Sequence, residues 1–215
     1  STLMRSSAAS DVYKRQVNYK QRYRTKQARF WASSYEDKRP ELTNAQRKML
    51  SHYDNATLYN DSIVAQIVKR FQKQDAIVIY VPDHGEECYE ENRGFICRNH
   101  SAEIDWPLAH YEFEIPFWIY CSPKYIRNHR DIYRQIRKAK DKRFMTDALP
   151  HLLLYLAGIE TPTYKEEYNI LSPKYDEMRP RILKNSADYD KLRDAHLEKI
   201  KKEESKKVKK KERRN

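Results

Sequence analysis

The stretch Ala76-Ile77-Val78-Ile79-Tyr80-Val81-Pro82-Asp83-His84-Gly85 decides the fold. Its first six residues are all apolar and rich in β-branched side chains, which is typical of a central strand covered on both faces. The run stops at Pro82, so Asp83 and His84 follow directly after the strand. In open α/β sheets, ligands gather at the carboxyl ends of the strands. The position of Asp83 and His84 therefore makes them the first candidate site residues.

Helical patterns flank this strand on both sides. Thr43 predicts a helix start, with Gln46 as its capping-box partner, and apolar residues follow helical spacing to about Lys73. After a polar loop, residues 113–120 resemble a second strand, in which Pro116 favours an edge or a bulge. Further along, the sequence predicts a helix from Ser122 to about Lys140. A Leu-rich helix follows, which Thr146 caps and Gly158 ends. The remaining pattern predicts a short strand at 181–183 and weak helicity over 187–204. This alternation predicts an α/β sandwich.

The composition of the 215 residues narrows the class of protein. Three glycines exclude Gly-rich phosphate loops, and the mean hydropathy of −1.02, with no long apolar run, excludes a membrane-spanning helix in the sequence given. The 43 Lys and Arg against 31 Asp and Glu leave a net charge of +12. Residues 199–215 hold ten of these cations and three Glu. Such a tail can bind nucleic acid or anionic lipid, or it can be a solvated end.

Asp83 and His84 have the chemistry of metal ligands. A carboxylate oxygen and an imidazole nitrogen are both ordinary ligands of zinc. Side chains of adjacent strand residues point to opposite faces, but a chain that leaves a strand turns and can bring both onto one ion. The tripeptide alone is a weak signal, because a capped turn with a surface histidine has the same sequence.

The order of the motifs is more specific than the tripeptide. Tyr53-Asp54-Asn55-Ala56-Thr57-Leu58-Tyr59-Asn60-Asp61 is followed by the strand into Asp83-His84-Gly85-Glu86, then by His100, the 115–119 strand and the 146–160 helix. With this order, residues 17–185 resemble the alkaline phosphatase/sulfatase superfamily, and most closely the phosphoethanolamine transferases of Gram-negative envelopes. The resemblance implies an alkaline-phosphatase-like α/β sandwich that is incomplete, with only its C-terminal portion present.

The resemblance also implies a site and a reaction. Asp83 and His84 correspond to metal ligands for Zn²⁺, and His100 resembles the histidine that contacts the phosphoryl group or a second zinc ion. The implied donor is phosphatidylethanolamine, and the implied acceptor is lipid A or the core sugar of lipopolysaccharide. The family has membrane helices upstream, so the resemblance implies an inner-membrane protein with a periplasmic catalytic domain, and no nucleic acid partner.

This sequence departs from the family before Val17. The family's threonine nucleophile, a metal-binding glutamate and a further histidine lie upstream of the matching region, so we expect this chain alone to be catalytically inactive. Residues 1–16 are interpreted as a non-native or disordered leader, because 11–16 can be encoded by a DNA string resembling a sequencing adapter. Residues 186–215 are interpreted as a basic helical or disordered tail. Two alternatives remain: a sulfatase or other metal-dependent phosphohydrolase of the same superfamily, and a basic nucleic-acid-binding module.

The cysteines and the acidic residues near the motif also lead to expectations. Cys88 and Cys97 flank a loop and can form a disulfide in a periplasmic domain, or be unrelated thiols. Cys121 is expected to be a small buried apolar side chain. The acidic residues after Gly85 predict a solvated loop; they are Glu86, Glu87, Glu90 and Glu91.

Overall fold

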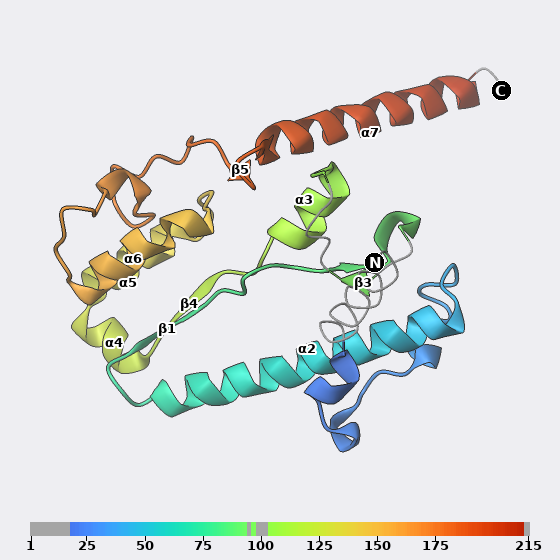
Figure 1. Cartoon of the computed structure of the whole chain (residues 1–215). Coiled ribbons are helices and arrows are strands. Elements are labelled where there is room, and N and C mark those ends of the chain that lie inside the picture. The colour runs from blue at the N-terminus through green and yellow to red at the C-terminus, as the bar shows by residue number, and fades with distance from the viewer. Residues whose placement is uncertain (1–17, 94–95, 98–102, 213–215) are drawn as a thin grey trace, which may run out of the picture. The chain divides into compact units, whose positions relative to one another are not determined.

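The structure is a computed structural model that describes residues 18–93, 96–97 and 103–212 (Figure 1). The chain divides into two compact units. The first contains residues up to Arg70 together with 82–102, and the second contains residues 71–81 together with 103–215. Among the described residues, no helix combines the length and the apolar character that crossing a bilayer requires. Each unit has its own core and is described separately.

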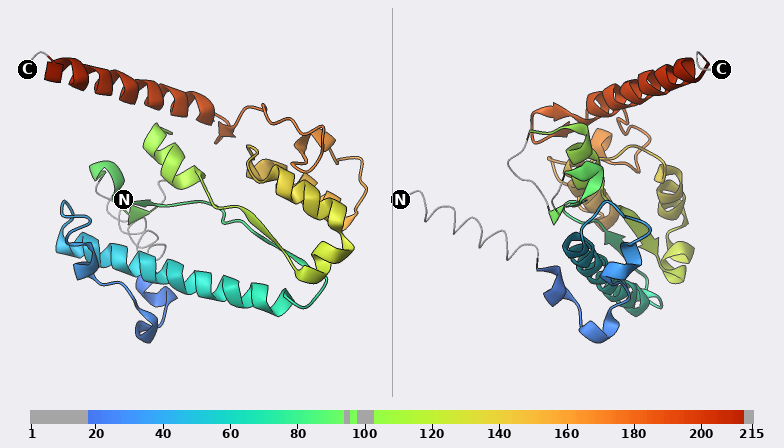
Figure 2. Two further views of the ribbon diagram at one scale, coloured as in Figure 1. Left: turned by 180° about the vertical axis from the view of Figure 1, so that it is seen from behind. Right: turned by 90° about the vertical axis from the view of Figure 1, so that its right-hand side faces the viewer.

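The first unit is organised by the long helix α2, Asn44–Phe71, whose last residue is in the second unit (Figure 2). The predicted capping box is confirmed: the Gln46 side chain accepts from the Thr43 backbone N–H at 2.8 Å, and the Thr43 hydroxyl accepts from the Gln46 N–H at 3.3 Å. From residue 18 onward, three 3₁₀ turns precede α2: η1 (Tyr19–Arg22), η2 (Thr25–Gln27) and η3 (Ala32–Tyr35).

Aromatic residues of the 3₁₀ turns and the first half of α2 form the core of this unit. Its buried members are Tyr19, Tyr35, Leu42, Leu50, Ala56, Cys88 and Tyr89. After Gly85 the chain forms the antiparallel pair β2 (Glu87–Cys88) and β3 (Ile96–Cys97), joined through η4 (Glu90–Asn92). Residues that directly follow the Asp83-His84 motif therefore belong to the core.

The second unit contains the predicted first strand, β1, Ile77–Tyr80. It pairs antiparallel with β4 (Trp118–Cys121), with Ile77 opposite Cys121 and Tyr80 opposite Trp118. The expectation of a doubly covered central strand is wrong for the described residues, because β1 has one partner strand there and all four of its residues are only half-buried. Continuous apolar character predicted a strand here but not the number of strands beside it.

The predicted strand over 113–120 is replaced by two elements. Helix α3, Trp106–Phe113, occupies part of the expected polar loop and ends at Phe113, so only Trp118–Cys121 is extended in a sheet. The Asp105 side chain accepts from the Leu108 N–H at 3.0 Å, and Pro107 lies in the first turn of α3. This is the same cap-and-proline arrangement that predicts the helix after Ser122.

The predicted helix from Ser122 to Lys140 is two helices, α4 (Pro123–Asn128) and α5 (Arg130–Ala139). The cap is confirmed, since the buried Ser122 hydroxyl accepts from the Tyr125 N–H at 3.0 Å. His129, with φ −126° and ψ 51°, is not helical and separates them. The Leu-rich helix α6 spans Leu149–Ala157 and ends, as predicted, at Gly158 with φ +66°.

Thr146 does not cap α6. It is the first residue of the 3₁₀ turn η5 (Thr146–Ala148), and the N-cap residue of α6 is Ala148. The expected short strand is confirmed as β5 (Ile182–Leu183), which pairs with β6 (Ala187–Asp188). The 3₁₀ turn η6 (Glu166–Tyr168) precedes this pair in the chain.

The C-terminal helix α7, Tyr189–Glu212, follows β6 directly and lies beside α3 (Figures 1 and 2). Tyr189 is buried with Ala109 and Leu183, and the Trp106 ring stacks on His196 of α7 at 5.3 Å between centroids. The first turns of α7 are thus packed within the second unit, while its later residues up to Lys206 are exposed.

Candidate metal centre

Asp83 and His84 lie three and four residues after the end of β1. The Oδ2 atom of Asp83 is 3.6 Å from the Nε2 atom of His84. Two ligands that each lie about 2.1 Å from a tetrahedral zinc ion are about 3.4 Å apart, so this separation fits a shared ion. The Asp83 side chain is 87% exposed and that of His84 is 23% exposed, which leaves the carboxylate accessible from solvent.

The imidazole of His84 is oriented by the backbone. Its Nδ1 atom lies 2.7 Å from the carbonyl oxygen of Gly85. A carbonyl oxygen can only accept, so Nδ1 carries the proton, and in the neutral ring the lone pair is then on Nε2. Histidine ligands of metals are commonly held in this way by a carbonyl behind the ring. The nitrogen that faces Asp83 is thus the one that can bind a cation.

The donor set of one carboxylate and one imidazole fits zinc, but it is only a pair. Within the described ranges, no group of three or more His, Cys, Asp and Glu side chains is placed to hold a metal ion. A catalytic zinc site has three protein ligands and an open position. The described residues therefore supply at most part of a ligand set.

The loop after the pair is fixed by tyrosines of the core. The Tyr19 hydroxyl donates to the Glu86 carboxylate, and the Tyr19 ring packs edge-on against Tyr53 at 5.2 Å between centroids. Burial, followed by the interaction with Glu86, raises the pKa of Tyr19 above its usual range, and burial also raises the pKa of Tyr53. Both phenols therefore remain neutral hydrogen-bonding groups at neutral pH.

The Tyr53-Asp54-Asn55 motif has a structural role in this unit. Asn55 is 2% exposed, and its side-chain oxygen accepts from the backbone N–H groups of Arg29 (2.6 Å) and Phe30 (3.1 Å). Its amide nitrogen donates to the carbonyl of Phe30 at 2.8 Å. Asp54 accepts from the Tyr35 hydroxyl. These contacts attach residues 29–35 to α2 and build the core beside the loop that contains Asp83 and His84.

The expectation of a solvated acidic loop is wrong for Glu87. Its side chain is 1% exposed, and one carboxylate oxygen lies 2.8 Å from Nε of Arg93. Burying a carboxylate is costly unless it is paired. The ion pair explains how Glu87 is accommodated, and it gives Arg93 a structural partner.

The structure describes the side chains of two of the three cysteines, Cys88 and Cys121. Cys88 is a buried free thiol that lies opposite Ile96 in the β2–β3 pair, and the side chain of Cys97 lies outside what the structure describes. Burial and nearby carboxylates raise the pKa of the Cys88 thiol. Cys121 is buried, as expected. The candidate site residue His100 lies outside the described residues.

Comparison with known proteins identifies the family. A family model described as Sulfatase matches residues 15–159. The chain is 30% identical over 164 residues to phosphoethanolamine transferase EptC of Escherichia coli O18:K1:H7, covering 75% of this chain and 27% of that protein. It is also 30% identical over 129 residues to Kdo(2)-lipid A phosphoethanolamine 7''-transferase of E. coli K12, covering 59% and 21%. The chain thus spans about a quarter of the length of these relatives.

A solved structure gives the same answer for the fold. The C-terminal periplasmic domain of E. coli EptC, in complex with Zn, superposes with a TM-score of 0.64 at 28% identity, over 81% of this chain and 49% of that domain. This match confirms the expected alkaline-phosphatase-like α/β fold, in part of its full extent. The chain belongs to the sulfatase family.

Proposed function

We propose that residues 17–185 are part of the catalytic domain of a zinc-dependent phosphoethanolamine transferase. The observation that carries the proposal is the Asp83–His84 pair, with its 3.6 Å separation and its carbonyl-oriented imidazole. It lies in a chain whose relatives are named as phosphoethanolamine transferases. Residues 1–16 and 186–215 are proposed to be a leader and a basic tail outside the catalytic region.

In this proposal Asp83 and His84 bind the zinc ion through Oδ2 and Nε2, and the Gly85 carbonyl keeps the imidazole in place. His100 is proposed to contact the transferred phosphoryl group. When bound, zinc supplies positive charge against the phosphoryl oxygens and lowers the pKa of a nucleophilic hydroxyl. The core tyrosines Tyr19 and Tyr53 keep the loop after His84 in position from behind.

The proposed donor is phosphatidylethanolamine and the proposed acceptor is lipid A or the lipopolysaccharide core. Support comes from the relative named as a Kdo(2)-lipid A transferase and from the periplasmic domain that shares the fold. We propose that the reaction takes place in the periplasm, at the inner membrane.

We further propose that this 215-residue chain alone does not catalyse phosphoethanolamine transfer. Within the part of the chain that the structure describes, two protein ligands leave zinc without the third that a catalytic site needs. Purified chain incubated with zinc, phosphatidylethanolamine and lipid A should yield no modified lipid by mass spectrometry. Zinc-dependent transfer that disappears in Asp83→Ala would contradict this statement.

A chimera tests the function itself. The region of E. coli EptC that matches this chain is replaced by residues 17–185, and lipid A modification is measured by mass spectrometry. We expect transfer, a loss of at least about 100-fold on Asp83→Asn or His84→Ala, and no change on Asp141→Asn, an exposed carboxylate remote in sequence. Bound zinc is measured in parallel. A chimera that retains zinc and a cooperative unfolding transition but transfers nothing would overturn the proposal.

A further inference from the structure

The segment containing α4 and α5 forms a strongly basic surface of the second unit. Between Pro123 and Asp141 there are seven Lys or Arg and two Asp, a net of five positive charges. All seven cations are exposed. Asp131 pairs with Arg134, and Asp141 lies 3.6 Å from Lys140. The other cations have no carboxylate partner among the residues described; they are Lys124, Arg127, Arg130, Arg137 and Lys138.

The packing of α5 fixes which way this charge faces. Ile132 and Ile136 pack on the core that contains Ala139 and Leu152, and Gln135 accepts from the Tyr155 hydroxyl of α6 at 2.9 Å. The opposite side of the helix carries the cations at helical spacing (Arg130, Arg134, Arg137 and Lys138). The apolar side packs on this core, and the basic side faces solvent. We call the exposed cations of α4 and α5 the basic face.

An apolar groove adjoins the basic face. It has a volume of about 410 Å³ and runs between β4 and α5, lined by apolar residues that include Phe117, Ile136 and Phe144. Arg137, Lys140 and Lys142 are among its lining residues. Lys142 is held there by a 3.1 Å hydrogen bond to the carbonyl of Ile170. The groove thus combines an apolar interior with cations.

We propose that the basic face and this groove bind the surface of an anionic membrane. Exposed cations on one helix side attract anionic headgroups, and an apolar groove between cations can accept part of an acyl chain. A nucleic acid satisfies the charge equally well but has no group for the apolar groove, so the combination favours lipid. The proposal does not depend on the metal site or on transfer activity.

Vesicle binding tests the proposal with the full 215-residue chain. Sedimentation with vesicles of phosphatidylglycerol and phosphatidylcholine (1:3) should show binding that high salt reverses, and pure phosphatidylcholine vesicles should show little. Substituting Arg130→Ala, Arg137→Ala and Lys138→Ala together should weaken binding on the order of 100-fold, from about fivefold for each charge removed. Circular dichroism and thermal unfolding verify that the variant is folded.

The matched control removes the same charge from α7. The triple change Lys199→Ala, Lys201→Ala and Lys206→Ala alters three exposed cations and should change vesicle binding by less than about threefold. If the α7 variant loses binding and the folded α5 variant keeps it, the proposal is wrong and the tail is the anionic site. A duplex DNA oligonucleotide is measured at the same salt concentration. Tighter binding to DNA than to the vesicles, lost in the α5 variant, would also overturn the lipid assignment.

Discussion

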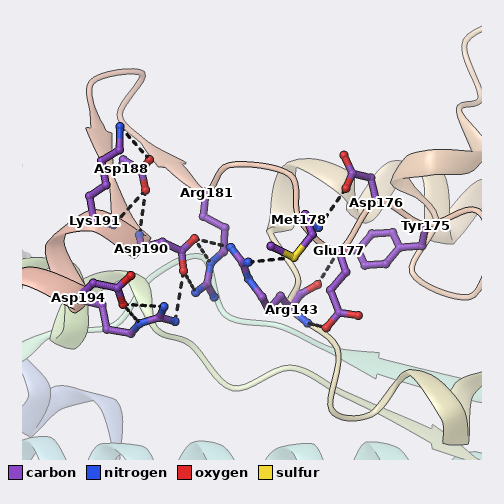
Figure 3. A network of polar contacts seen from close by, with 11 residues as sticks. Arg143, Tyr175, Asp176, Glu177, Met178, Arg181, Asp188, Asp190, Lys191 and Asp194 are labelled. Carbon is purple, nitrogen blue, oxygen red and sulfur yellow. Dashed lines mark hydrogen bonds and ion pairs between the residues drawn. The ribbon is translucent and has the colours of Figure 1, made fainter. Parts of the chain in front are cut away.

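Two arginine-rich regions of the second unit use their charge in different ways. At the start of α7, the carboxylate of Asp190 is shared by Arg143, Arg181 and Arg193, with a 2.6 Å contact to Arg181 and a 3.2 Å contact to Arg193 (Figure 3). Arg143 also donates its backbone N–H to Glu177 at 3.2 Å, and its carbonyl accepts from Tyr175. On the basic face, the cations extend into solvent and most have no carboxylate partner within the described ranges.

The difference lies in desolvation. Asp190 is 19% exposed, so its ion pairs operate in a partly dry environment and connect three segments of the chain. The Asp131–Arg134 pair on α5 joins two strongly exposed side chains of one helix, and pairs of that kind contribute little. We therefore expect charge near Asp190 to stabilise the fold, and charge on the basic face to be available for binding.

Asp190→Asn should have the largest effect. Arg143 and Arg181 lose their anion while remaining partly buried, whereas Arg193 keeps its 2.9 Å contact to Asp194, so the free energy of unfolding should fall by about 2–4 kcal/mol. Urea denaturation measures the loss. The control Asp131→Asn removes a carboxylate from an exposed pair and should change the stability by less than about 0.5 kcal/mol. Equal effects of the two substitutions would remove the distinction between the regions.

Asn55→Ala tests whether burial or charge determines the losses of stability expected for Asp190→Asn and Asp131→Asn. Asn55 is neutral, but it is buried and satisfies the backbone of Arg29 and Phe30. Its removal leaves those groups without partners, at a cost of about 2–3 kcal/mol measured by urea denaturation. The exposed neutral control Asn60→Ala should cost under about 0.5 kcal/mol. A small effect at Asn55 would mean that charge, rather than burial, dominates near Asp190.

The pH dependence of stability sharpens the comparison. Hydrogen bonding to Arg181, with the charges of Arg143 and Arg193, lowers the pKa of Asp190 below its ordinary value. The stabilisation is therefore complete above the unfolded pKa of about 3.9, and it is lost as the pH falls through the lowered folded pKa. In urea titrations between pH 5 and pH 2, Asp190→Asn should show a shallower decline of stability than the parent chain. An unchanged slope would count against this assignment.

The smallest effect is expected on the basic face. Arg130→Ala, Arg137→Ala and Lys138→Ala together remove three solvated cations that have no described carboxylate partner, so thermal and urea unfolding should shift by less than about 0.5 kcal/mol. A stabilisation would fit relief of repulsion among like charges. A loss of more than about 1.5 kcal/mol would show that this face supports the fold and would weaken its assignment to binding.

The sequence predicted the helix ends that are determined by residues at those same ends. The capping pair of Thr43 and Gln46 set the start of α2, and Gly158 set the end of α6. Helix α3 was also predictable, because Asp105 and Pro107 form the arrangement that correctly indicated α4 after Ser122. That signal was present and was missed.

Other features depend on contacts between distant residues. The break between α4 and α5 coincides with two contacts to Asp75, a 2.7 Å hydrogen bond from Asn128 and a 3.4 Å contact from His129. Nothing near His129 in the sequence indicates them. The position of Asp83 and His84 after a strand was predictable, and the ring orientation set by Gly85 was not. The burial of Glu87 likewise depends on Arg93, in a loop that looked uniformly polar.

The two buried thiols offer a way to time the opening of each unit separately. Cys88 lies in the core of the first unit, and Cys121 lies at the end of β4 in the second. Burial raises both thiol pKa values, so each cysteine should react slowly with an alkylating reagent until its surroundings open. With Cys97 replaced by serine, the labelling rate of Cys88 reports the opening of the first unit, and the labelling rate of Cys121 reports the opening of the second. Comparison of the two rates shows which unit opens first.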